Sequence, residues 1–450
     1  MAPAAAATGK PSRALSRHYH NSVPQEMQLH RRLALAGRRA AGYKSTSALR
    51  SAGARFPGSS ARSIPVKRRE AEPQLDDILR LHRGGKTRMV SRLKLETIEQ
   101  LRQVYTPGVA RVSKMIEADP SLVYDYTSIG DTVAVITNGT AVLGLGDIGV
   151  LGAMPVMEGK SVIFMEMVDI AAVPLLVQSH DPRRVIEAVE AISPTFGAIL
   201  LEDIAAPACF EIEDELKRRL DMPVFHDDQH GTACVVLAAL ISALKITGKR
   251  KEDLRVVFNG AGAAASAVAR FLLKFGVGDV VLCDRAGAVY RGRTENMNPA
   301  KEKIAGETNR GNQRGALAEV IRGKDVFIGL SVAGILTKDM VRSMAPGPII
   351  FAMANPVPEI WPEEALAAGA AAAEDGRHVN NALGFPGIFR GTLDARARQI
   401  NEEMKIAASS ALAELAPEGE LVPDFMDKSV HRAVADAVAA AARRTGVARL

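Results

Sequence analysis

The stretch Val256-Val257-Phe258-Asn259-Gly260-Ala261-Gly262-Ala263-Ala264-Ala265 joins an apolar, β-branched run to a helical pattern. It has the GxGxxA form of the dinucleotide fingerprint, in which the first two glycines allow a tight turn and a close approach of the backbone to a pyrophosphate. The fingerprint alone is a weak signal, but here a strand, a turn, a helix and a second apolar strand at 279–283 follow in order. We therefore predict a dinucleotide-binding unit; the alternative is a glycine-rich turn in an ordinary α/β unit.

The acid that ends the second predicted strand bears on the choice of dinucleotide. Asp284 lies 24 residues after Gly260, where a carboxylate can bind the ribose hydroxyls of NAD and repel the additional phosphate of NADP. Arg285 follows directly and can pair with that phosphate. The sequence therefore leaves the choice between NAD and NADP open, with a slight preference for NAD.

Apolar runs and helical patterns alternate on both sides of this unit. Strands are predicted at 132–137, 161–167, 198–201, 224–226, 326–329 and 349–353, and helices at 182–192, 214–220, 232–246, 263–274 and 428–444. Such alternation is typical of α/β folds with a mostly parallel sheet. We predict two domains, over residues 74–230 and 231–450, of which the second is a Rossmann-type, doubly wound domain.

Length and composition exclude several classes of protein. The 450 residues are 47% hydrophobic and 24% charged, as in ordinary globular proteins, and exceed one small domain. The longest apolar run, 233–244, has 12 residues, fewer than the roughly 18 that suggest a membrane span. Three scattered cysteines favour a reducing compartment over a disulfide framework. We therefore expect a soluble protein with no membrane partner.

Positive charge is concentrated in residues 1–69, which hold 14 Lys and Arg but one acid. Since the chain has 57 basic and 51 acidic residues, the remainder holds 43 and 50, and this mild acidity argues against nucleic-acid binding. An Arg-rich, acid-poor leader resembles an organelle transit peptide. A disordered basic tail and a start codon placed too far upstream are the alternatives. We expect residues 1–73 to be an extension, and the location to be a mitochondrial-type organelle or the cytoplasm accordingly.

Acidic residues directly follow two of the predicted strands, as Glu202-Asp203 and Asp227-Asp228. In parallel α/β folds the carboxyl ends of strands line the ligand crevice, and carboxylates that converge there repel one another unless a cation lies between them. All-oxygen ligands suggest Mg²⁺ or Mn²⁺. The alternative, that these acids cap the following helices, stays open for Asp227.

Two further side chains stand at turns. Tyr105 precedes a chain reversal, and Lys160 lies between a predicted turn and the predicted strand 161–167. Burial at such a place would lower the pKa of the lysine toward that of a usable base. Spacing alone equally allows a half-buried core tyrosine and a lysine whose charged end stays in solvent. We interpret His226 and His230, which have no HxxH or Cys partners, either as residues that contact the metal ligands or as structural residues.

Eight ordered motifs over about residues 74–450 resemble the malic enzymes, most closely their small bacterial-type subunit. They are Tyr105–Ala110, Thr137–Gly149 (TNGTAVLGLGDIG), Met154–Ser161 (MPVMEGKS), Leu201–Pro207 (LEDIAAP), Phe225–Ala233 (FHDDQHGTA), Gly260–Ala265, Ala354–Ile360 (ANPVPEI) and Asn380–Gly387 (NNALGFPG). The resemblance implies an N-terminal malic-enzyme α/β domain and a C-terminal Rossmann-type NAD(P)-binding domain, without the phosphotransacetylase-like domain that follows in some relatives.

The resemblance also implies a reaction, the oxidative decarboxylation of malate to pyruvate and CO₂ with reduction of NAD or NADP, in a homo-oligomer that needs Mg²⁺ or Mn²⁺. It makes Tyr105 the general acid and Lys160 the general base. The implied metal ligands are Glu202, Asp203 and Asp228, with Asp227 beside them. The implied cofactor contacts are Gly260, Ala261, Gly262, Ala263, Ala264, Asn355 and Asn381, the two asparagines at the nicotinamide end and the substrate.

The chain departs from relatives at two places within the body. Ala141 stands where the large-type enzymes carry a substrate-binding Arg, and the stretch 372–379 looks shorter than in relatives. Two other functions share this scaffold: a malolactic enzyme, which retains its nicotinamide and releases lactate, and a non-catalytic, metabolite-sensing binding protein.

Overall fold

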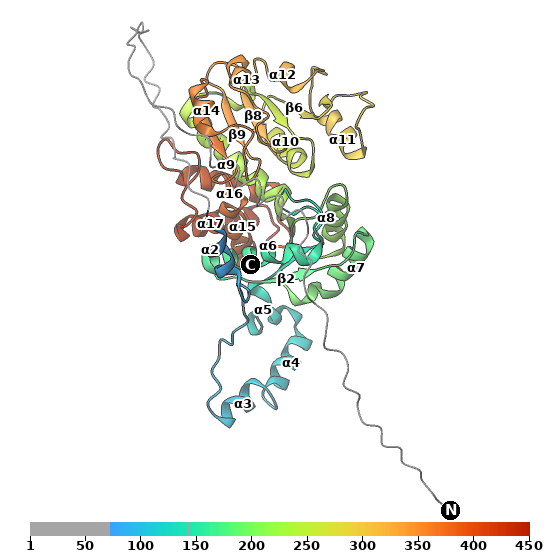
Figure 1. Ribbon diagram of the computed structural model, residues 1–450. Coiled ribbons are helices and arrows are strands. Elements are labelled where there is room, and N and C mark those ends of the chain that lie inside the picture. The colour runs from blue at the N-terminus through green and yellow to red at the C-terminus, as the bar shows by residue number, and fades with distance from the viewer. Residues whose placement is uncertain (1–72, 143) are drawn as a thin grey trace, which may run out of the picture. The chain divides into compact units, whose positions relative to one another are not determined.

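Two largely parallel sheets organise the computed structural model, which describes residues 73–142 and 144–450 (Figure 1). The transit-peptide prediction falls on residues outside this range. The first sheet has the order β2-β1-β3-β4 and is parallel throughout. Its strands are β1 (Thr132–Thr137), β2 (Ala171–Leu176), β3 (Ala198–Leu201) and β4 (Val224–His226). Its crossover helices are α6 (Gly149–Val168), α7 (Pro182–Ile192) and α8 (Ala208–Arg219).

The second sheet has the order β10-β9-β8-β5-β6-β7 and is parallel except for the short pair of β6 with β7. Its strands are β5 (Arg255–Asn259), β6 (Asp279–Asp284), β7 (Gly287–Ala288), β8 (Val326–Gly329), β9 (Ile349–Ala352) and β10 (Ala372–Asp375). The chain leaves β5 toward β6 on one side and later returns to β8 on the other, so the strand order reverses at β5. A dinucleotide binds at such a reversal in doubly wound sheets. The predicted α/β class is therefore confirmed.

Further α-helices follow β4 along the described chain. They are α9 (Thr232–Thr247), α10 (Ala263–Phe275), α11 (Pro299–Glu307), α12 (Leu317–Val320), α13 (Lys338–Ser343), α14 (Pro362–Ala367), α15 (Phe385–Asp394), α16 (Glu402–Leu415) and α17 (Lys428–Arg444). Helices α15 and α17 pack against α6, and α16 packs against α9. The C-terminal helices thus contact elements that precede residue 230 in the sequence and elements that follow it. The boundary between two domains at this residue stays a prediction.

The predicted strand at 161–167 is wrong, because these residues form the second half of α6. Ala153, Met157, Lys160, Ser161 and Phe164 are its buried residues. Helix α6 also carries apolar side chains at exposed positions such as Leu151 and Met165, so its sequence loses the 3.6-residue period and a short window of it looks like a buried strand. The strand of this region is β2, which follows the helix.

Helix α9 forms the centre of the largest core. Together with the π-helical turn η4 (Asp227–Gly231) it is the one helix among the described residues that is long and apolar enough to cross a membrane. It is nevertheless 61% buried within the fold, and it packs against α10 and α16. Its apolar composition is that of a core helix.

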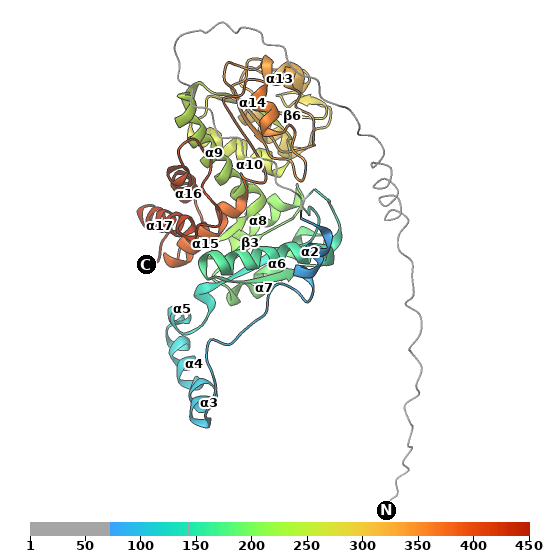
Figure 2. The ribbon, with the colours of Figure 1, turned by 60° about the vertical axis from the view of Figure 1, so that its left-hand side comes forward.

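Four helices precede the first sheet: α2 (Leu75–His82), α3 (Ile98–Val104), α4 (Val109–Ala118) and α5 (Val123–Tyr126). None of the described residues in these helices is buried. In both ribbon views α3 and α4 extend away from β2 and α6 (Figures 1 and 2). This segment leaves its apolar side chains exposed to solvent.

Candidate active site

The carboxyl ends of β3 and β4, which are neighbours in the first sheet, bring three carboxylates together. Glu202, Asp203 and Asp228 each place one oxygen within 4.8 Å of the others. Asp203 has a φ of 53°, and this turn of the backbone lets two consecutive residues face one site. The Asp203 N–H also donates a hydrogen bond to Asp228 Oδ2 over 3.0 Å.

These carboxylates fit a divalent cation. The Glu202 side chain is 4% exposed, and neither Glu202 Oε2 nor Asp227 Oδ1 accepts a hydrogen bond from any described residue. Burial raises the pKa of Glu202 well above its usual value; Lys160 opposes this shift and the neighbouring carboxylates add to it. Buried oxygens with unused lone pairs and mutual repulsion favour a bound cation, and an all-oxygen set suits Mg²⁺ or Mn²⁺.

Lys160 lies inside α6 and points into this cluster. Its Nζ donates to Asp227 Oδ2 and lies 3.1 Å from Glu202 Oε1 and 3.4 Å from Asn381 Oδ1. Burial lowers the pKa of Lys160, but the charges of Asp227 and Glu202 outweigh burial and the net pKa is raised. The prediction of a lowered pKa is therefore wrong for the protein without a cation. The structure does bring the predicted lysine, asparagine and acids together.

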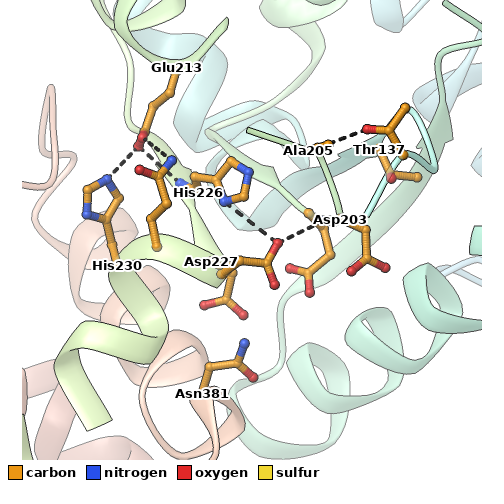
Figure 3. A network of polar contacts seen from close by, with 12 residues as sticks. Thr137, Asp203, Ala205, Glu213, His226, Asp227, His230 and Asn381 are labelled. Carbon is orange, nitrogen blue, oxygen red and sulfur yellow. Dashed lines mark hydrogen bonds and ion pairs between the residues drawn. The ribbon is translucent and has the colours of Figure 1, made fainter. Parts of the chain in front are cut away.

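The π-helical turn η4 carries Asp227 and Asp228, and hydrogen bonds to Glu213 of α8 hold it in place (Figure 3). Glu213 accepts hydrogen bonds from the His226 N–H at 3.1 Å, Gln229 Nε2 at 3.2 Å and His230 Nε2 at 2.8 Å. Burial lowers the pKa of His230 to about 4, so the ring is neutral and donates from Nε2. His230 thus supports the turn, whereas the ring of His226 lies beside the acid cluster, with Nδ1 3.8 Å from Asp228 Oδ2.

Glu213 is a residue that the sequence reasoning missed. It occupies the buried stripe of α8 together with Cys209, Ile212 and Leu216. The sequence did contain a signal for this role, because Glu213 is an acid on the apolar face of an amphipathic helix. A buried charge needs several partners, so such an acid is expected to bind other polar groups. Its position next to η4 makes it a support of the acid cluster.

Gly231 closes the turn against Asp227. A Cβ built on Gly231 would lie 1.8 Å from Asp227 Oδ1, so Gly231→Ala must displace the carboxylate that Lys160 contacts. We expect the free energy of unfolding to fall by about 1–3 kcal/mol, as for overpacked cores, in denaturant titrations. The matched control is Gly306→Ala in α11, where no described atom lies within 4 Å of the new Cβ. Equal stability of the two variants would contradict this reading of the turn.

The dinucleotide fingerprint adopts the predicted strand–turn–helix geometry. Gly260 follows β5 with a φ of +128°, and a Cβ there would lie 2.8 Å from the carbonyl oxygen of Leu330. Gly262 precedes α10, and no described atom lies within 4 Å of a Cβ built on it. Ala261, Ala263 and Ala264 are partly exposed around this open helix N-terminus, and α10 contacts η4. The turn therefore has room for a pyrophosphate next to the acid cluster.

Asp284 ends β6 within a network of cations. It accepts hydrogen bonds from Arg293 Nη2 at 2.6 and 2.8 Å, from Lys301 Nζ at 2.7 Å and from Asn296 Nδ2 at 3.0 Å. Burial raises the pKa of Asp284, but these donors outweigh it and the net pKa is lowered. The repulsion of a phosphate by Asp284, predicted from the sequence, is thus largely offset by two neighbouring positive charges.

The two remaining predicted residues lie in different surroundings. Asn355 follows β9 next to the loop that contains Gly144, whose Cβ position is 3.3 Å from the Asn355 carbonyl oxygen. Tyr105 follows α3 and is 66% exposed. The structure does not bring Tyr105 to the cluster around Lys160, since α3 extends away from α6 in both views (Figures 1 and 2).

Comparison with known proteins agrees with this geometry. The family model described as the malic enzyme N-terminal domain matches residues 84–183, and that of the malic enzyme NAD-binding domain matches residues 229–379. The bifunctional malic/malolactic enzyme of Bacillus subtilis is 52% identical over 83% of this chain and 94% of its own length. The NAD-dependent malic enzyme of Geobacillus stearothermophilus is 50% identical over 82% of this chain and 79% of its own length.

Solved structures show the same relationship. The malic enzyme from Pyrococcus horikoshii is 41% identical and superposes with a TM-score of 0.80 over 83% of this chain and 92% of its own. Identity at this level extends over nearly the whole of the Bacillus subtilis and Pyrococcus horikoshii proteins. The chain belongs to the malic enzyme family, whose members are oxidoreductases.

Proposed function

We propose that the chain oxidatively decarboxylates malate to pyruvate and CO₂ while it reduces NAD or NADP, with a divalent cation bound. The observation that supports this proposal most is the contact of buried Lys160 with Asp227 and Glu202, beside three converging carboxylates. A base, a cation site and a dinucleotide turn within one crevice are what the oxidation of a 2-hydroxy acid requires.

In the proposed reaction Lys160 Nζ takes the hydroxyl proton of malate as hydride leaves C2 for the nicotinamide. Lys160 is positioned by Asp227 and Asn381, and it loses its proton more readily once bound cation neutralises Glu202, Asp203 and Asp228. A divalent cation on these ligands supplies Lewis acidity at the C2 oxygen during CO₂ loss. Tyr105 then donates its proton to C3 of the enolate. The proton that Lys160 took from the hydroxyl group of malate restores the phenol of Tyr105.

The direct test is an assay of the purified full chain with malate, Mn²⁺ and either NAD or NADP. We expect reduced nicotinamide and pyruvate to appear in equal amounts. A folded protein that neither consumes malate nor reduces either cofactor would overturn the proposal and leave the binding-protein alternative.

Removal of the metal gives a further prediction. EDTA should abolish activity and Mn²⁺ should restore it, because the three converging carboxylates repel one another without a cation. Asp228→Asn keeps the side-chain size and removes one charge, so the Kd for Mn²⁺ should rise by at least about 10-fold, the effect of losing even an outer partner of a metal site. Asp214→Asn, at an exposed position of α8, is the control. Full activity in EDTA would contradict the role of the three acids.

A second candidate function, malolactic activity, deserves its own measurement because one relative is named a bifunctional malic/malolactic enzyme. Such an enzyme retains its nicotinamide and reduces pyruvate before release. Lactate formed from malate without net accumulation of reduced cofactor would identify that activity in this chain.

Cofactor choice should depend on Asp284. Asp284→Ser frees Arg293 and Lys301, which then face the additional phosphate of NADP as charge-assisted donors. We expect the ratio of kcat/KM for NADP to that for NAD to rise by about 10–100-fold, since hydrogen bonds to charged groups contribute about 1.5–3 kcal/mol. Asp279→Ser at the start of the same strand is the control. An unchanged ratio would show that the phosphate binds elsewhere.

We also propose a homo-oligomer in which a second copy covers α2–α5. The large apolar side chains exposed in this segment include Leu75, Ile78, Leu79, Leu81, Met89, Val90, Leu93, Leu95, Ile98, Leu101, Val104, Val109, Met115 and Tyr126. Exposed apolar surface of this extent marks an interaction site. A second copy is the favoured occupant, because Tyr105 belongs to this segment and the crevice around Lys160 still needs a proton donor.

A further inference from the structure

A cavity of about 590 Å³ lies on the far side of η4 from the acid cluster. It is lined by residues of α8, η4 and α10 and by the first turns of α11 and α16. None of the described residues assigned above to catalysis, metal or cofactor lines it. Its volume is within the range of about 300–1,000 Å³ typical of small-molecule sites. The cavity is therefore large enough for a ligand other than malate or the dinucleotide.

Five basic side chains line the cavity. They are Lys217, Arg270, Lys274, Lys303 and Lys405. The acids that contact these basic groups each have more than one partner. Glu402 Oε1 lies 3.3 Å from Lys274 Nζ and 2.8 Å from Lys405 Nζ. Glu213 lies 2.7 Å from Lys217 Nζ while it also holds η4, and Arg270 pairs with Glu307 outside the lining. Of the exposed lining residues, Glu211 and Asp214 are acidic and Lys274 and Lys303 are basic, so the lining as a whole holds five basic and four acidic side chains.

Helix dipoles add to this positive potential. The first residues of α8, α11 and α16 line the cavity, and the N-terminus of a helix carries a partial positive charge. Phe210 and Phe271 contribute an apolar wall. Lys405 is 5% exposed, and an ammonium group so far from solvent interacts strongly with a ligand anion. The chemistry favours a small anion that can pair with several of these basic side chains at once.

We infer that this cavity is an effector site for a small polyvalent anion, a carboxylate or a phosphate, whose binding changes the affinity of the acid cluster for its cation. The binding half of this inference stands on the cavity alone. The regulatory half rests on the proposed function.

A chain of polar contacts connects the cavity to the acid cluster, and Figure 3 shows the part of it around Glu213 and His230. Glu402 contacts Lys405, Lys405 Nζ lies 3.3 Å from His230 Nδ1, and His230 Nε2 donates to Glu213. Glu213 in turn holds the turn that carries Asp227 and Asp228. An anion that pairs with Lys405 or Lys217 competes with Glu402 and Glu213 for their ammonium groups and so alters the support of η4. The bound anion also contacts helices that cover both sheets. Two sites are coupled when a ligand makes such contacts more favourably in one conformation of the protein than in another.

Binding is tested by isothermal titration calorimetry of the full chain, without metal or nucleotide, against tricarballylate and against inorganic pyrophosphate. These two probes distinguish a carboxylate ligand from a phosphate ligand. We expect at least one of them to bind, with the Kd raised at least about 10-fold in Lys274→Gln/Lys303→Glu, two exposed positions of the lining. The control variant Lys428→Gln/Lys338→Glu makes the same changes at exposed helix positions elsewhere and should bind like the wild type. No binding of either probe, or equal loss in both variants, would overturn the site.

Regulation is tested by the Kd for Mn²⁺, followed through the electron paramagnetic resonance signal of free Mn²⁺. The probe that binds should change this Kd at least about 5-fold in the wild type and leave it unchanged in Lys274→Gln/Lys303→Glu. The probe also chelates free Mn²⁺ in solution. This effect is the same in the presence of either protein, so it cancels in the comparison. Binding without this difference would overturn the regulatory half. Neither measurement needs turnover, so a chain without malate activity would contradict the proposed function alone.

Discussion

Lys160→Ala is expected to lower the rate of malate oxidation by roughly 10²–10⁴, the usual contribution of a positioned acid or base. Lys160 is the one basic side chain in direct contact with Asp227 and Glu202 among the described residues. Its loss removes the acceptor of the hydroxyl proton without touching Glu202, Asp203 or Asp228. Decarboxylation of added oxaloacetate, which needs the cation and no base, should therefore fall much less than malate turnover.

The comparison of the two reactions separates a chemical role from a structural one. Removal of Lys160 leaves the negative charges of Asp227 and Glu202 without their partner, so thermal unfolding is followed with and without Mn²⁺. Lys324→Ala, which removes another mostly buried lysine far along the chain, reports the cost of losing such a side chain in general. Equal loss of malate oxidation and oxaloacetate decarboxylation in Lys160→Ala would show that the lysine only supports the metal site.

Much of the second sheet could be predicted because its elements follow local rules. The fingerprint turn at Gly260 needs a positive φ and a close approach to Leu330, and only glycine meets both conditions without strain. The acids after β3 and β4 could be placed together because parallel strands end at one edge. Both inferences depend on short stretches of chain and on a sheet geometry that varies little.

The errors concern residues whose role depends on distant parts of the chain. The apolar run at 161–167 was predicted as a strand because α6 carries apolar side chains at exposed positions such as Met165 as well as at buried ones, which removes the helical period. The pKa of Lys160 was predicted to fall because burial can be inferred locally, whereas contact with Asp227, 67 residues away, cannot. Glu213 and the cations around Asp284 were missed for the same reason: each contact joins residues from separate elements.

Tyr105→Phe should slow the ketonisation of enolpyruvate by roughly 10²–10⁴ if the phenol is the proton donor. The variant keeps the ring and loses only the hydroxyl, and Tyr105 is 66% exposed, so the fold and the Mn²⁺ affinity should be unaffected. Exchange of the pyruvate methyl protons into D₂O, followed by NMR, measures this step directly. Tyr126→Phe, an exposed tyrosine of the same segment, is the control. Wild-type exchange in Tyr105→Phe together with lost exchange in Lys160→Ala would reverse the two assignments.

Mixing the two inactive variants tests whether Tyr105 acts on the crevice of a second copy. If each site takes Lys160 from one copy and Tyr105 from the other, a dimer of one Lys160→Ala chain and one Tyr105→Phe chain has one intact site and one doubly altered site. Random mixing then restores about a quarter of the wild-type activity, since about half of the symmetric dimers are mixed. If both residues come from one chain, every site in the mixture lacks one of them and activity stays at the level of the single variants. Recovery on mixing would explain why a residue expected in the active site lies on an exposed, apolar segment, because the second copy that covers the segment also completes the site.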